Sequence, residues 1–180
     1  MGAVADSGPL IHLAQADQIR LLRAIFREAL IVPPVKREVV DEGIRLGYSD
    51  AKLVADAIAL GYIVVHKITN RVARRASKLS EEERISQTDA ETLSLAHGLR
   101  KPLLTDERTL SKLGKMYHLE VWNTWTILLE ALRRTLIGKE KIEAAIREVE
   151  QKRHKLSPDT AKVIRDAVEK IGASKNAGSR

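Results

Sequence analysis

Short apolar runs alternate with longer helical patterns along most of this chain, and this alternation limits the folds available to it. Five runs of about four residues are each followed by a segment whose apolar residues recur at helical spacing. The runs are Ala3–Ala5, Leu30–Val32, Tyr62–Val65, Pro102–Thr105 and Leu119–Trp122. Strands that alternate with helices pair in parallel, because each helix carries the chain back to the start of the next strand. The sequence therefore predicts an α/β fold with a four- to five-stranded parallel sheet flanked by helices.

The pattern changes after Gly138, where no further strand follows and only helical spacing continues. Residues 139–155 and 158–171 are typical of two amphipathic helices. This C-terminal helical extension is followed by a short polar tail. We predict an α/β domain over residues 1–137, a helical pair over 138–172 that packs on or extends it, and a disordered tail over 173–180.

Composition narrows the classes of function. The chain has no cysteine, which excludes disulfides, thiolate zinc sites and cysteine nucleophiles. It has neither a membrane-spanning apolar stretch nor a signal-peptide pattern, so we expect a cytoplasmic protein without membrane contacts. The net charge is +7, and from Arg133 onward 13 Lys and Arg stand against 7 Asp and Glu. A basic surplus attracts nucleic acid, and a solvated helix face of mixed charge explains it equally well.

Acidic residues stand where the predicted strands end or the following helices begin. In chain order they are Asp6, Glu38, Asp89, Glu91, Asp106 and Glu107. Parallel strands end at one edge of a sheet, and chemistry in open α/β sheets collects there, so we expect these side chains to meet. Taken singly, each is explained as a helix cap or a surface acid, and Asp6 is well placed to cap the helix that follows it.

Carboxylates that meet at one edge require a cation, because like charges at short range raise each other's pKa. Carboxylate oxygens are hard ligands that select Mg²⁺ or Mn²⁺. Such a metal lowers the pKa of a bound water, holds a phosphate oxygen and stabilises the charge that develops in an in-line displacement. The joint placement of the acids therefore favours metal-assisted phosphoryl chemistry over unrelated surface acids.

Four motifs carry a resemblance to a known family. They are Val4-Ala5-Asp6-Ser7-Gly8-Pro9-Leu10-Ile11, Val32-Pro33-Pro34-Val35-Lys36-Arg37-Glu38-Val39, Thr88-Asp89-Ala90-Glu91-Thr92-Leu93-Ser94-Leu95-Ala96 and Leu103-Leu104-Thr105-Asp106-Glu107-Arg108. In this order and spacing the chain resembles a PIN domain, the fold of many metal-dependent ribonucleases, including the VapC toxins of bacteria and archaea. The resemblance covers roughly residues 3–125. It differs at Gly8-Pro9, which replaces the small polar residue that usually follows the Asp-Ser start.

The resemblance implies a PIN-like parallel sheet, an acidic pocket that holds one or two Mg²⁺ or Mn²⁺ ions, and hydrolysis of RNA phosphodiester bonds. Residue by residue, it implies that Asp6, Asp89 and Asp106 bind metal. It implies that Glu38 positions or deprotonates the attacking water. These four acids are the predicted catalytic residues.

The fourth acid has an alternative. Many family members read Thr-x-Asp at the fourth motif, and that alignment selects Glu107 instead of Asp106. We prefer Asp106, because it is closer to the end of the strand, and keep Glu107 as the alternative. Glu91 is a further alternate acid.

RNA is the expected partner. A basic helical face formed by Arg71, Arg74, Arg75 and Lys78 is placed to contact its phosphates, and a solvated face is the alternative. The first hypothesis is a metal-dependent endoribonuclease, in the role of a toxin with an antitoxin protein as partner and with a homodimer as its assembly. The alternatives are an RNA-processing nuclease outside toxin–antitoxin systems and a PIN-like module that binds RNA or protein with weak or no catalysis.

Overall fold

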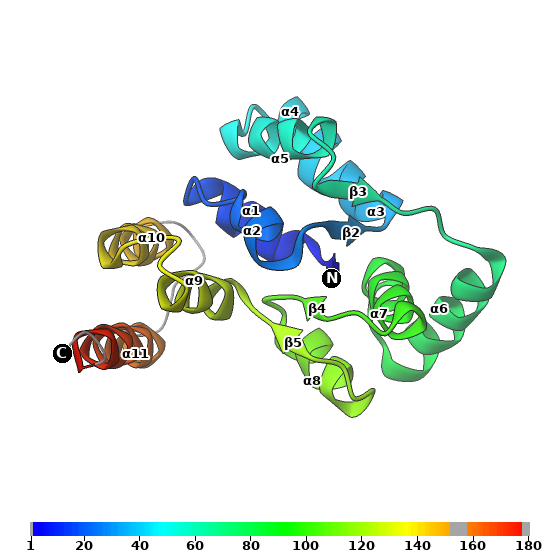
Figure 1. The fold of residues 1–180 in the computed structure, drawn as a ribbon. Coiled ribbons are helices and arrows are strands. Elements are labelled where there is room, and N and C mark those ends of the chain that lie inside the picture. The colour runs from blue at the N-terminus through cyan, green and yellow to red at the C-terminus, as the bar shows by residue number, and fades with distance from the viewer. Residues whose placement is uncertain (1, 152–157, 178–180) are drawn as a thin grey trace. The chain divides into compact units, whose positions relative to one another are not determined.

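The computed structural model describes residues 2–151 and 158–177. It divides into two compact units, Met1–Thr124 and Trp125–Arg180. Figure 1 shows the path of the chain through both units, from the N-terminal strand to the C-terminal helix. None of the helices within the described ranges is long and apolar enough to cross a membrane.

A five-stranded sheet forms the centre of the first unit. Its strands are β1 (Ala3–Ala5), β2 (Ala29–Ile31), β3 (Ile63–Val65), β4 (Leu103–Leu104) and β5 (Val121–Trp122). Every pairing is parallel, and the strand order is β3-β2-β1-β4-β5. Val4 of the central strand pairs with Leu30 on one side and Leu103 on the other. The predicted parallel α/β sheet is confirmed.

The central strand is apolar along its whole length, because both of its faces are covered by helices. Ala3, Val4 and Ala5 are fully buried. Parallel strands that are buried on both faces read as continuous apolar runs instead of alternating ones. This is why the run was recognisable in the sequence, and why the chain turns polar only where the strand ends, at Asp6.

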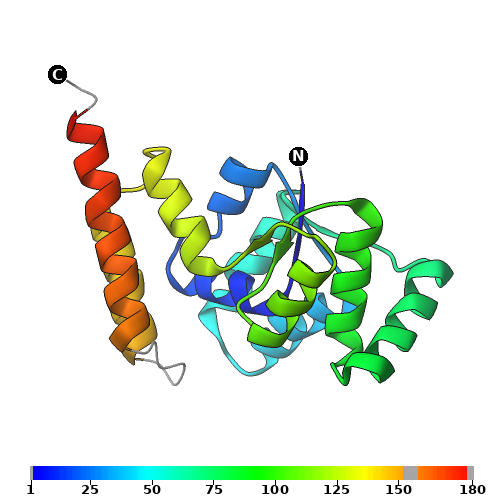
Figure 2. The same cartoon turned by 90° about the horizontal axis from the view of Figure 1, so that it is seen from below.

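Helices cover the two faces of the sheet. In this unit they are α1 (Ser7–Gln15), α2 (Leu21–Phe26), α3 (Pro33–Lys36), η1 (Arg37–Glu42), α4 (Gly43–Arg45), α5 (Ser49–Ala59), α6 (Asn70–Glu83), α7 (Gln87–Leu99) and α8 (Arg108–Met116). Figures 1 and 2 show α1 and α5 on one face and α7 and α8 on the other. Right-handed crossovers produce this arrangement, because the chain moves outward from β1 to β3 and then returns across the sheet to β4 and β5.

The reversal of strand order places β1 beside β4. In open α/β sheets, ligands bind at the carboxyl ends of the strands where the order reverses. Asp6 follows β1, and the Asp106–Glu107 pair comes soon after β4. The topology therefore brings the first and last acidic motifs of the sequence to one crevice.

The helical segment after β2 is not α-helical throughout. Its middle, Arg37–Glu42, is π-helical. The wider turn brings residues five apart to the same side, and the Lys36 ammonium lies 2.5 Å from Asp41. Such π-helical turns are rare and are frequently found at functional sites. Here the turn contains Glu38, the second acid of the predicted site.

The C-terminal end of α6 is polar. α6 continues to Glu83, through the polar residues 80–83. It ends at Arg84, which has a left-handed backbone with a φ of 54°. Ser80 explains part of the extension, because its hydroxyl donates to the Ile85 carbonyl and ties the final turn to the loop beyond it.

The second unit contains α9, α10 (Lys139–Gln151) and α11 (Pro158–Ala177), and α9 begins at Thr124 (Thr124–Arg133). The division between the two compact units falls at Thr124, so α9 is grouped with α10 and α11. The predicted boundary at residue 137 stays a prediction. α11 continues to Ala177, past the start of the predicted tail. A single glycine costs a helix only about 1 kcal/mol, so Gly172 does not end it. The predicted end of α10 at Lys155 and the last residues 178–180 lie outside the described residues.

Two helical glycines differ in the space around them. A Cβ on Gly114 of α8 would lie 2.9 Å from both Leu103 and Val121, whereas a Cβ on Gly98 of α7 would meet nothing within 4 Å. We expect Gly114→Ala to lower the free energy of unfolding by about 1–3 kcal/mol, because the side chains of Leu103 and Val121, or α8 itself, must shift to make room. Gly98→Ala is the matched control and should raise stability by about 0.5–1 kcal/mol. Denaturant unfolding measures both, and equal effects would contradict this packing.

Candidate active site

Asp6 is buried at the carboxyl end of β1, with a relative exposure of 8%. It is the N-cap of α1, and one carboxylate oxygen accepts the Ser7 backbone N–H at 2.7 Å. The other oxygen accepts the Thr105 hydroxyl at 3.0 Å. Asp6 therefore links the ends of the two neighbouring strands, and its carboxylate is held in one position. The capping role considered in the sequence is present at the same residue.

The electrostatic surroundings of Asp6 disfavour its charge. Burial raises the pKa of Asp6 to about 6, and the negative charges of Asp89 and Glu38 add to this effect. The hydrogen bonds from Ser7 and Thr105 lower the pKa and compensate only in part. A buried carboxylate that keeps two further acids within electrostatic range is typical of a functional site.

Glu38 is joined to Asp6 through the intervening serine. The Ser7 hydroxyl donates to the Glu38 carboxylate at 2.7 Å. Ser7 itself is buried in the first turn of α1, whereas Glu38 is exposed on the π-helical turn. One carboxylate oxygen of Glu38 is therefore held by Ser7 at the N-terminus of α1. The Glu38 side chain as a whole stays accessible to water.

Asp89 and Glu107 interact through their charges. Asp89 lies in the first turn of α7, where the Ser86 hydroxyl accepts its backbone N–H at 3.0 Å. Burial raises the pKa of Glu107, the charge of Asp89 raises it further, and a hydrogen bond from Thr109 opposes them. The Glu107 backbone N–H donates to the Thr105 hydroxyl, the same group that holds Asp6. Glu107 is thus connected to the other acids through both its charge and its backbone.

Asp106 makes a different set of contacts. One oxygen accepts the Thr124 backbone N–H at 2.8 Å, and the other accepts the Thr124 hydroxyl at 2.6 Å and His12 Nδ1 at 2.7 Å. Burial raises the pKa of Asp106, but these hydrogen bonds outweigh burial and leave the pKa below its usual value. Asp106 therefore joins α1 to the segment after β5. No other acid contributes to its pKa shift, unlike the shift of Glu107.

The acids are near one another without converging on a point. Within residues 2–151 and 158–177, no three His, Asp or Glu side chains are close enough together to hold a metal ion as they are positioned. The donor set nevertheless suits Mg²⁺ or Mn²⁺, because it consists of carboxylate and hydroxyl oxygens and includes a buried acid whose charge lacks compensation. Glu38 and Glu107 have long, exposed side chains that can turn toward Asp6 and Asp89.

The remaining predicted residues lie outside this group of contacts. Glu91 accepts a hydrogen bond from Gln87 at 3.1 Å, one turn earlier on α7. Arg71, Arg74, Arg75 and Lys78 are exposed on α6, as the basic face predicts. Arg75 contacts His97, and Lys78 lies 3.6 Å from Glu82. RNA binding by this face stays a prediction.

His12 and Thr124 are the residues that sequence reasoning missed. Neither residue belongs to the four motifs or to the set of acids, so the sequence does not mark them. Their contact with Asp106 depends on β1, β4 and β5 lying side by side, which no local spacing reveals. The one available signal was the position of Thr124 directly after a strand, at the same edge as the acids.

Comparison with known proteins agrees with this fold. A family model described as a PIN domain matches residues 2–170, which include the whole first unit except Met1 and the second unit as far as residue 170. None of the curated proteins searched is significantly similar to the chain. The match extends beyond the predicted α/β domain into the C-terminal helices. The chain therefore belongs to the PIN-domain family.

Proposed function

We propose that this protein is a Mg²⁺- or Mn²⁺-dependent endoribonuclease that hydrolyses RNA phosphodiester bonds. The observation that carries the proposal is the buried Asp6 carboxylate, whose pKa is raised to about 6 beside Asp89 and Glu38. A buried acid among acids is costly to the fold, and a bound cation offsets that cost. The PIN fold is nuclease-like, which supports a hydrolase and leaves metal and substrate as parts of the proposal.

Each acid has a role that follows from its surroundings. Asp6 and Asp89 would hold the metal, with Glu107 as the third acid on that side. The metal supplies a water of lowered pKa and stabilises charge on the phosphate oxygens. Glu38 is accessible and is oriented by the Ser7 hydroxyl, so it is placed to align the attacking water and accept its proton. Thr105 keeps the Asp6 carboxylate in position.

RNA cleavage under controlled metal conditions tests the proposal. We expect the protein to cleave single-stranded RNA with Mg²⁺ or Mn²⁺ and to be inactive with excess EDTA, with activity restored by adding the metal back. A gel assay of an end-labelled RNA measures this. Cleavage that persists in EDTA, or no cleavage with either metal at a range of RNA sequences, would contradict the proposal.

A PIN-like binding module is the second candidate. The separation of the acids within the described residues is the observation that favours it. Binding of RNA without cleavage in the same assay would support the module.

Two expected roles, a toxin held by an antitoxin protein and an RNA-processing nuclease, differ in their partners. Co-purification of a small protein that inhibits cleavage would support the toxin role, and size-exclusion chromatography tests the expected homodimer.

A further inference from the structure

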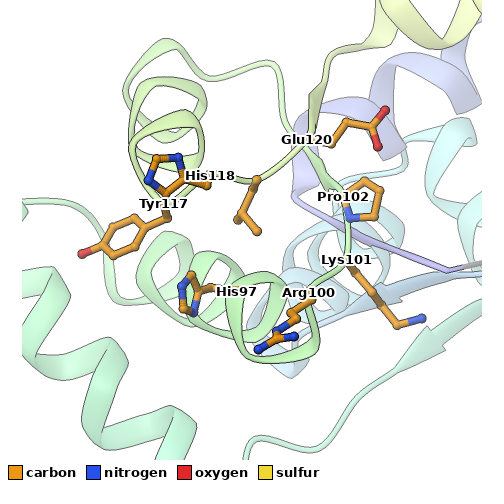
Figure 3. A pocket seen from close by; sticks show the side chains of 8 residues that line it. His97, Arg100, Lys101, Pro102, Tyr117, His118 and Glu120 are labelled. Carbon is orange, nitrogen blue, oxygen red and sulfur yellow. The ribbon is translucent and has the colours of Figure 1, made fainter.

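A second concave site lies in the first unit, at the opposite edge of the sheet from the acids. It is a hollow of about 460 Å³ beside the residues that lead into β4 and β5. His97 and Arg100 come from the end of α7, and Tyr117 and His118 from the end of α8 (Figure 3). Asp89 is in the first turn of α7 and Arg100 follows its last turn. The rise along the helix from Asp89 to Arg100, about 16 Å at 1.5 Å per residue, separates this hollow from the acidic site.

Positive groups dominate the lining. Arg100 and Lys101 line the hollow beside the rings of His97 and His118, and Glu120 is the one acid among the lining residues. Glu120 accepts the Trp122 indole N–H at 2.8 Å, so that oxygen is already occupied. Lys101 lies 3.6 Å from Glu28, whereas no carboxylate of the described residues forms an ion pair with Arg100. The hollow therefore has an uncompensated guanidinium group.

The contacts of the His97 ring leave Nε2 as its hydrogen-bond donor. Arg75 lies 2.8 Å from His97 Nδ1, and because a guanidinium can only donate, Nδ1 accepts and the proton is on Nε2. Burial and the charges of Arg75 and Arg100 lower the pKa of His97, which agrees with a neutral ring. Tyr117 fixes the pair, since its ring meets His97 edge-on at 5.5 Å and lies 5.7 Å from the Arg75 guanidinium. His97 and Arg100 thus offer hydrogen-bond donors to a ligand with anionic oxygens.

Helix dipoles are the simpler explanation for cations at these helix ends, because the C-terminus of a helix favours positive charge. The left-handed backbone of Arg100 and His118, with φ values of 52° and 56°, is ordinary for a helix end and is shared by Arg84. The Ala96 and His97 carbonyls near the end of α7 are already bonded to the N–H groups of Arg100 and Lys101. These carbonyls therefore do not need the Arg100 side chain for capping.

We propose that this hollow binds a phosphate group of single-stranded RNA, with Arg100 as the principal contact. The choice of RNA as the ligand rests on the proposed function, and the phosphate chemistry rests on the donors and charge of the hollow itself. Guanidinium groups pair with phosphate through two parallel hydrogen bonds, and phosphate contacts position a strand without reading its sequence. Arg75 connects the hollow to the basic face of α6, which extends the positive surface along one side of the unit.

The test compares two arginines in the same backbone conformation. Arg100→Gly removes the proposed contact, and Arg84→Gly, at a φ of 54° at the end of α6, removes an arginine that does not line the hollow. Each variant lowers the net charge of +7 by one and relieves the same backbone strain. Binding of a fluorescent single-stranded RNA is measured by anisotropy in EDTA, where metal-dependent cleavage does not occur. Thermal unfolding confirms that both variants are folded.

We expect Arg100→Gly to raise the Kd for RNA about tenfold and to reduce the slope of log K against log salt by about 0.7, the value for one lost phosphate contact on a single strand. Arg84→Gly should bind as the wild type does. Equal weakening in both variants, or no weakening in Arg100→Gly, would overturn the site. A nucleoside monophosphate that binds as tightly as the RNA in an Arg100-dependent way would overturn the assignment to RNA. Arg100-dependent binding of RNA without any cleavage would support this phosphate site. The same result would contradict only the proposed nuclease activity.

Discussion

Asp6→Asn should abolish metal-dependent RNA cleavage, with a fall in rate of at least about 100-fold. The substitution keeps the size of the side chain and removes its charge. The asparagine oxygen can still accept the Ser7 N–H, and the Thr105 hydroxyl can rotate to accept from the new amide group. The position of α1 is therefore retained, and the loss of activity reports the loss of a negatively charged metal ligand.

The same substitution should stabilise the metal-free protein. The pKa of Asp6 is raised from 3.8 to about 6 on folding, so the folded state holds a proton more tightly than the unfolded state does. Stability from this group is complete below pH 3.8 and is lost as the pH rises through about 6. Asparagine does not ionise, so at pH 7 in EDTA we expect Asp6→Asn to raise the free energy of unfolding by on the order of 2 kcal/mol.

Urea unfolding at several pH values, with and without Mg²⁺, measures this effect. The wild type should lose its stability disadvantage when Mg²⁺ is added, whereas the variant should not respond to the metal. Asp56→Asn is the control, because it makes the same chemical change at an exposed position of α5. A variant that cleaves RNA at the wild-type rate would remove Asp6 from the mechanism. A variant that is inactive and strongly destabilised would show that its role is structural.

The acid at the end of β1 could be predicted because its signal is local. A buried parallel strand needs a continuous apolar run, and the first polar residue after Val4 and Ala5 marks the edge of the sheet. The same reasoning gives the position of each strand, and the four motifs give the family. The number of strands and their parallel pairing also follow from alternation, whereas their order depends on contacts between distant segments.

The π-helical turn and the orientation of adjacent acids could not be predicted, because they depend on contacts between distant segments. Apolar spacing around Val35 and Val39 fits an α-helix, and the wider turn at Glu38 leaves no mark in that pattern. Asp106 and Glu107 both lie beyond the strand, so the alternation of side chains along β4 does not decide which of them faces Asp6. Asp106 accepts hydrogen bonds from Thr124, which follows another strand. The distance of an acid from the strand end does not determine which contacts its side chain makes, so the choice between Asp106 and Glu107 stays a prediction.

Substitutions at the two adjacent acids should have opposite consequences. We propose that Glu107, and not Asp106, is the fourth acid of the site, because Glu107 shares its electrostatic surroundings with Asp89. Glu107→Gln should reduce RNA cleavage at least about tenfold with little change in stability, since its side chain is exposed. Glu107→Asp keeps the charge and should retain more activity than Glu107→Gln.

Asp106→Asn should instead destabilise the fold by about 1–3 kcal/mol at pH 7, because its carboxylate accepts bonds from the Thr124 N–H, the Thr124 hydroxyl and His12. Those bonds lower the pKa of Asp106, so its stabilising effect is present above pH 3.8 and is lost as the pH falls through the lower, folded-state pKa. The stability difference from the wild type should therefore shrink in acid. Cleavage rates and urea unfolding of both variants decide the matter. An Asp106→Asn protein that is fully stable and inactive, beside an active Glu107→Gln protein, would return the metal-binding role to Asp106.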